Sequence, residues 1–127
     1  MEQVVQMRQE ALDEENASRL TAEHLLAVAY RDNGQTRHAV KLLERVVAVQ
    51  EKVLAEDHPS QLASQHELAG AYRVDGQVKK AVELLEHVVA VHKKVLAEDH
   101  PDRLLSQHAL AIAYRELYVA LHHNMYA

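Results

Sequence analysis

The apolar positions along this chain predict helices in pairs. Apolar residues from Leu62 to Tyr72 lead to Asp75-Gly76, a turn signal, and predict a helix that ends there. The next stretch, "KKAVELLEHVVAVHKKVL", spreads its apolar positions too widely for a single stripe, so this helix must contact neighbours on two sides. Because such a pair cannot bury its apolar faces alone, we expect further pairs to stack beside it.

The pattern recurs with a period of 42 residues. "LAEDHP" occurs at 54–59 and 96–101, and "AYR" occurs at 29–31, 71–73 and 113–115. Aligning 12–53 with 54–95 gives 23 identities in 42 positions, and aligning 54–73 with 96–115 gives 15 in 20. Such regularity is the sequence signature of a repeat architecture. We expect one domain over 1–127, made of a partial unit 1–11, full units 12–53 and 54–95, and a partial unit 96–118 with a divergent helical tail 119–127.

The expected fold is all-α, a right-handed α-solenoid of about six helices in antiparallel pairs. Pro59 and Pro101 suit the first turn of a helix, and Gly34 and Gly76 suit the left-handed position that ends one. His58 and its counterpart His100 precede the prolines, where an imidazole can make a capping hydrogen bond. The predicted helices lie near 2–14, 18–33, 36–55, 60–75, 78–97 and 102–118, the last running on without a turn to about residue 123.

The repeated residues resemble the tetratricopeptide repeat (TPR) family. Its spacing is matched by Leu26, Ala27, Tyr30, Gly34 and Ala39, and again by Leu68, Ala69, Tyr72, Gly76 and Ala81. The usual Trp is replaced by Glu23, Gln65 and Gln107, and the period is 42 residues rather than about 34. That variant is similar to the kinesin-light-chain type. The amino-acid sequence of the repeats resembles even more closely the C-terminal TPR arrays of fungal NLR-like (NACHT or NB-ARC) STAND proteins, and the resemblance covers 4–118.

The resemblance implies a scaffold that binds a protein or peptide in a concave groove lined by the first helix of each pair. It implies the ligand-sensing and oligomerising part of a STAND protein or, alternatively, a cargo adaptor similar to the kinesin light chain. The positions matching the groove are Thr21, His24, Val28, Arg31, His66, Gly70, Arg73, His108, Ile112 and Arg115. Arg suits carboxylates or phosphorylated side chains. Two interpretations stay open: the repeated His and Arg residues contact a ligand, or they stabilise the stack by pairing with the next unit.

Catalytic chemistry and metal binding are not expected. His66-Glu67 could begin a zinc-hydrolase helix, but such a helix needs a second His four residues later, where this chain has Gly70. The sister copies lack the Glu, having Leu25 and Ala109. The chain has no Cys, no Gly-rich phosphate loop and no Ser in a nucleophile elbow, so we expect no cofactor, no metal and no enzyme activity.

Charge and hydropathy narrow the expected partners. A net charge of −5 argues against a general nucleic-acid binder. The chain has no run of eighteen apolar residues, so we expect no membrane-spanning helix. We expect a cytoplasmic protein. After Arg115 the repeat pattern gives way to an apolar end, and we expect a homodimer through this last helix by way of Leu117, Tyr118, Leu121 and Met125.

Overall fold

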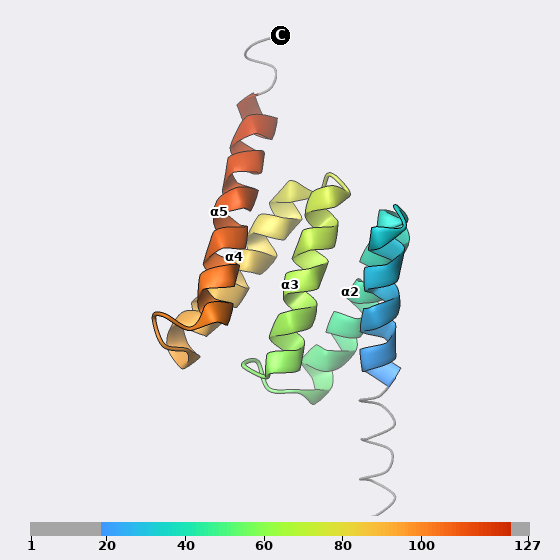
Figure 1. The fold of residues 1–127 in the computed structure, drawn as a ribbon, viewed down its shortest axis with the longest axis horizontal. Helices are drawn as coiled ribbons and strands as arrows, with labels where there is room; N and C mark the ends of the chain where they lie inside the picture. Colours follow the sequence, from blue (N-terminus) through green and yellow to red (C-terminus); the bar gives the residue numbers. More distant parts are fainter. Residues whose placement is uncertain (1–18, 123–127) are drawn as a thin grey trace, which may run out of the picture.

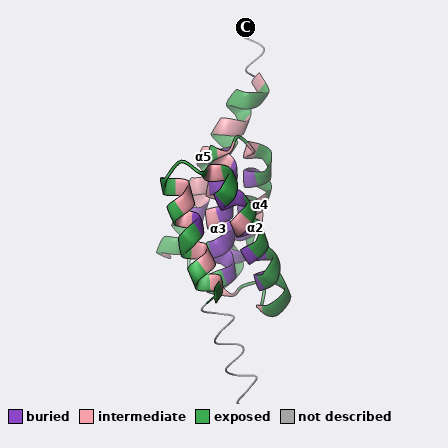
Figure 2. Cartoon of the chain, turned by 90° about the vertical axis from the view of Figure 1, so that its right-hand side faces the viewer, coloured by how far each residue is buried: buried purple, intermediate pink, exposed green. Residues whose placement is uncertain are grey.

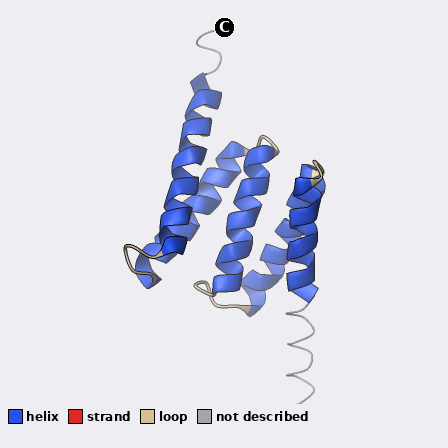
Figure 3. Cartoon of the chain, viewed as in Figure 1, coloured by secondary structure: helices blue, strands red, loops and turns tan. Residues whose placement is uncertain are grey.

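The computed structural model describes residues 19–122, which form helices joined by short loops, with no strand in this range (Figure 1, Figure 3). The first described helix covers 19–32. It is followed by α2 (Thr36–Val53), α3 (Pro59–Val74), α4 (Val78–Val95) and α5 (Pro101–His122). These five helices match five of the six predicted ones to within two residues, apart from the extended end of the last. The predicted helix near 2–14 lies outside the described residues.

The helices form two layers of an all-α solenoid. Helix 19–32, α3 and α5 lie side by side in one layer, with α2 and α4 behind them (Figure 1). From α2 onwards, each helix packs against the next one along the chain, α2 on α3, α3 on α4 and α4 on α5. Buried residues gather between the layers (Figure 2). The first helices of all units therefore lie on the same side of the solenoid, and the second helices do not cover that side.

The ends of the first helices are set by glycine. Gly34 has φ 78° and Gly76 has φ 84°, as the turn signals predict. At the first of these ends the Gln35 N–H donates to the Tyr30 carbonyl at 2.8 Å, and at the second the Gln77 N–H donates to the Tyr72 carbonyl at the same distance. This is the Schellman arrangement, in which a residue with positive φ lets the chain satisfy the last carbonyls of a helix. The predicted left-handed positions are therefore confirmed.

The starts of α3 and α5 are capped by histidine. The Nδ1 atom of His58 accepts a hydrogen bond from the Ser60 N–H at 3.1 Å, and His100 Nδ1 accepts from the Asp102 N–H at 3.1 Å. An unpaired N–H at a helix start is thereby satisfied by a side chain, which is the role that Ser, Thr, Asp or Asn usually fills. The predicted capping by both histidines is confirmed, as is the place of Pro59 and Pro101 in the first turns.

The core between the layers depends on small residues and on one tyrosine. Ala27, Ala69 and Ala113 are fully buried, which allows close approach of neighbouring helices. Tyr72 fills the space between pairs, and its hydroxyl donates to Glu44 Oε2 of α2 at 2.6 Å. Burial and this carboxylate together raise the pKa of the Tyr72 hydroxyl well above its usual range.

The last helix continues beyond the body of the solenoid. α5 runs unbroken to His122, which confirms the predicted extension to about residue 123. Its final turns project past the ends of α3 and α4 and are exposed or half-buried (Figure 1, Figure 2).

Candidate partner-binding face

Two of the three repeated arginines join neighbouring units. Arg31 Nη1 donates to Glu67 Oε2 at 2.5 Å, and Arg73 Nη1 donates to Glu116 Oε1 at 2.8 Å. Both are charge-assisted hydrogen bonds between one first helix and the next, and both are partly buried. Arg115 is exposed and makes no ion pair with any residue in 19–122. The pairing interpretation therefore describes Arg31 and Arg73.

The two carboxylates do not come from equivalent positions. Glu67 aligns with Ala109 of the next unit, whereas Glu116 aligns with Val74 of the preceding one. Glu67 has no counterpart in the sister copies, yet it forms an ion pair that joins two units. The arginine is periodic but its partner is not, so alignment of the repeats alone does not reveal the pair.

The other predicted groove positions differ in their surroundings. His24 and His66 are half-buried and line one cleft, whereas His108 is exposed and is not among the residues that line it. Val28 and Ile112 are half-buried and Thr21 is exposed. A Cβ atom added at Gly70 would lie 3.9 Å from Arg31 Nη1, so Gly70 borders the first arginine pair.

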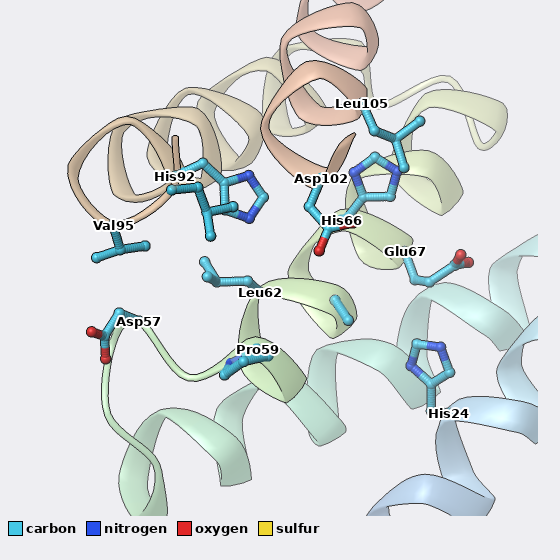
Figure 4. Close-up of a pocket in the computed structure, with 12 residues that line it drawn as sticks. His24, Asp57, Pro59, Leu62, His66, Glu67, His92, Val95, Asp102 and Leu105 are labelled. Carbon is cyan, nitrogen blue, oxygen red and sulfur yellow. The ribbon is translucent and has the colours of Figure 1, made fainter. Parts of the chain in front are cut away.

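The cleft has a volume of about 260 Å³ and opens on the face of the first helices (Figure 4). Side chains from α3, α4 and α5 surround it, with His24 of helix 19–32 at its edge (Figure 4). Its apolar lining consists of Pro59, Leu62, Ala63, Val95, Leu96 and Leu105. The remaining lining residues are three histidines, His24, His66 and His92, and three carboxylates, Asp57, Glu67 and Asp102.

His92 is the buried polar residue of this cleft and was not found from the sequence. Its side chain comes from α4, only 8% of the residue is exposed, and its Nδ1 lies 2.8 Å from Ser106 Oγ of α5. Because Ser106 Oγ donates to the Arg103 carbonyl at 3.0 Å, its single proton is used there, and His92 Nδ1 must be the donor to the hydroxyl. Burial lowers the pKa of His92, Asp102 raises it, and His66 and His100 lower it.

The sequence did contain a signal for this interface. His92 and Ser106 align with Gln50 and Ser64 of the preceding unit, and all four residues are buried. The buried position that holds an amide in the preceding unit, Gln50, thus holds the imidazole of His92 in this one. The groove positions expected from the sequence all lie on the first helices, whereas His92 belongs to a second helix.

The C-terminal surface offers a second apolar area. Leu117 packs against the core of this chain, whereas Tyr118 and Leu121 are exposed. The Tyr118 ring stacks on His122 with centroids 4.1 Å apart. Met125, the fourth residue predicted for self-association, lies outside the described residues.

Residues 19–122 contain no group of three or more His, Cys, Asp or Glu side chains placed to hold a metal ion. None of the helices in the same range is long and apolar enough to cross a membrane.

Comparison with known proteins identifies the class. The model of the tetratricopeptide repeat family matches residues 18–94 and 60–117, and the chain belongs to this family. Tetratricopeptide repeats generally mediate protein–protein interaction and are generally non-enzymatic. No curated protein matches the chain.

The chain is also similar to solved structures of repeat proteins. The chain is 60% identical to the crystal structure described as "Podosopora anserina putative kinesin light chain nearly identical TPR-like repeats", with a TM-score of 0.74. The match covers 78% of this chain and 47% of that one. A single-substitution variant of the same protein matches with the same values. The chain therefore spans about half the length of these solved relatives.

Proposed function

We propose that the chain is a binding module whose first-helix face holds a peptide or protein segment. The observation that supports this most directly is the cleft between α3 and α5, which is lined by residues of three successive units and by two of the repeated histidines, His24 and His66. Concave sites with an apolar lining and a few converging polar groups are the usual form of a binding site.

The cleft replaces the arginines as the centre of the proposed groove. Since Arg31 and Arg73 are engaged with Glu67 and Glu116, their guanidinium groups would have to leave a carboxylate before they could bind a ligand. The contribution of Arg31 and Arg73 to binding is thus indirect, through the spacing of the first helices, and Arg115 is the one of the three arginines without an ion pair among residues 19–122.

The test is selection of peptides on the chain itself. Random peptides displayed on phage are selected on the immobilised 127-residue chain and ranked by affinity. Ala63→Leu introduces into the cleft the side chain that the next unit has at the equivalent Leu105, and Ala90→Leu makes the same change at an exposed position of α4. We expect selected peptides to bind Ala63→Leu at least tenfold more weakly than Ala90→Leu. Equal binding to both variants would refute the cleft as the site.

Two biological settings follow from the sequence and the comparisons. We propose that the chain is the ligand-sensing TPR part of a fungal NLR-like STAND protein, because the sequence of its repeats resembles those arrays. The alternative is a cargo adaptor similar to the kinesin light chain, which the solved relative favours because it is described as a putative kinesin light chain. Both settings are cytoplasmic. An NB-ARC or NACHT segment encoded with this array would support the first, and a heptad coiled coil would support the second.

We also propose that the exposed end of α5 pairs with a second copy. Tyr72 is 8% exposed between α2 and α4, whereas the equivalent Tyr114 of α5 is 46% exposed. Towards the end of α5, Tyr118, Val119 and Leu121 are more exposed still. Sedimentation of the wild type and of Leu121→Glu tests this proposal. A dimer that the substitution dissociates is expected, and a wild-type monomer at all concentrations would overturn it.

A further inference from the structure

Resting on the proposed function, we infer that the cleft between α3 and α5 takes an aliphatic side chain from a partner segment that bears Lys or Arg beside it. Three properties of the cleft favour such a ligand: its apolar lining, the small residue that leaves it open and the negative charge around its opening.

The lining fits an aliphatic group. Leu62 forms a buried part of the wall, while Val95 and Leu105 leave about half of their surface exposed at the opening. Covering such exposed apolar area stabilises a complex by roughly 25 cal/mol for each Å² removed from water. A closed apolar cavity of about 150 Å³ already accepts benzene. The 260 Å³ of this open cleft therefore suffices for a leucine-sized side chain.

The space exists because one residue is small. Ala63 lies at the position that Leu105 occupies in the next unit, and both line the cleft. A leucine at 63 would extend into the open volume, because the Ala63 methyl group is part of the lining. An alanine at this position is thus specific to the unit 54–95, because the equivalent residues are Thr21 and Leu105, whereas the buried alanines that let the helices approach recur in neighbouring units.

The charge around the opening is negative. Asp57, Glu67 and Asp102 are lining residues, and no Lys or Arg is among them. Glu67 is neutralised by Arg31, but Asp57 and Asp102 are exposed and form no ion pair within residues 19–122. A basic residue next to the apolar anchor would approach these two carboxylates, whereas an acidic residue would be repelled. Complementary charge of this kind selects among partners more than it adds affinity.

The experiment uses short probes on the full chain. Amide shifts in ¹H–¹⁵N spectra are followed during titration with acetyl-Leu-Lys-amide, acetyl-Leu-Glu-amide and acetyl-Ala-Lys-amide. We expect acetyl-Leu-Lys-amide to cause saturable shifts around Ala63, His66 and Leu105, with binding at least threefold tighter than for the other two probes. In the double variant Asp57→Asn, Asp102→Ser, the Lys and Glu probes should bind with equal affinity. The second change installs the residue of the equivalent position in the preceding unit, Ser60.

Controls separate this inference from the proposed function. Ala63→Leu should abolish the shifts and Ala90→Leu should leave them unchanged. No saturable shift at these amides, or equal or tighter binding of the Glu probe to the wild type, would overturn the inference. In either case selected phage peptides that depend on Ala63 would still support the binding face. A lack of any such peptides would instead refute the proposed function.

Discussion

The imidazole of His92 donates from Nδ1 to the hydroxyl of Ser106, 2.8 Å away, across the interface between α4 and α5. The hydroxyl in turn donates a hydrogen bond to the Arg103 carbonyl at 3.0 Å, so the three groups form one directed chain of hydrogen bonds. In the preceding unit the equivalent residues are Gln50 and Ser64, which are also buried. Two neighbouring interfaces of one fold therefore differ in that only one of them contains a titratable group at this position.

The stability of the chain should depend on pH through His92. Burial, together with His66 and His100, lowers the pKa of His92 in the folded state, and this outweighs the opposing effect of Asp102. At pH values below the pKa of His92 in the unfolded state, the unfolded chain therefore binds more protons than the folded one. The contribution is complete above about pH 6.5 and is lost as the pH falls towards the folded pKa, by at most about 1.4 kcal/mol per pH unit.

Urea unfolding at about pH 7.5 and about pH 5.5 measures this effect. His92→Gln, which installs the residue of the preceding unit, should reduce the loss of free energy of unfolding between the two pH values. An unchanged loss would show that other groups cause it. The matched control is His108→Gln, which makes the same change at an exposed position.

The ion pair between Arg31 and Glu67 should show measurable coupling. Their side chains are 31% and 24% exposed, so the pair is less screened by solvent than a surface pair. A double-mutant cycle with Arg31→Gln and Glu67→Gln should give a coupling free energy of about 0.5–1 kcal/mol. Arg115→Gln serves as the control and should change stability by less than about 0.5 kcal/mol. Additive single effects would contradict a stabilising role for the pair.

The imidazole caps should be replaceable by a better capping residue. His58→Ala removes the acceptor for the Ser60 N–H and should cost about 0.5–1 kcal/mol of unfolding free energy. His58→Asp keeps an acceptor and places a negative charge at a helix start, so it should be at least as stable as the wild type. Thermal unfolding of both variants decides the matter, and the same order is expected for His100. Equal stability of the Ala and Asp variants would mean that the cap contributes nothing.

The fold could be predicted from the sequence because its determinants are local and periodic. Gly34 and Gly76 need a left-handed conformation, Pro59 and Pro101 favour a helix start, and the apolar spacing between them fixes the helices. Each of these signals acts within a few residues and recurs 42 residues further along the chain. Alignment of the units therefore reinforced every one of them.

The proposed cleft could not be predicted from the sequence because its determinants are neither local nor periodic. His24 and His66 both line it, but its open space depends on Ala63 differing from Leu105. Its buried polar wall comes from His92 on a second helix. Contacts between side chains of different units follow from packing, and packing is not visible in a pattern of spacing.

Substitutions of Gly70, inside α3, and of Gly76, in the turn after it, should have opposite effects on stability. Gly70 lies inside the helix, where an added Cβ would make only an ordinary contact, 3.9 Å from Arg31 Nη1. Gly70→Ala should therefore stabilise the chain by about 0.5–1 kcal/mol, since alanine loses less conformational entropy in a helix. The equivalent positions hold Val28 and Ile112, so a side chain is compatible with this face of the fold.

Gly76→Ala provides the opposite case. The space around Gly76 is open, with no atom within 4 Å of an added Cβ, but its φ of 84° disfavours any side chain. The substitution should destabilise the chain by about 1–2 kcal/mol for conformational reasons alone. Denaturant unfolding of the two variants should thus give shifts of opposite sign. Loss of stability in Gly70→Ala would show that the space beside Arg31 is needed for its pairing with Glu67, and an unchanged Gly76→Ala would show that the left-handed turn is not required to end α3.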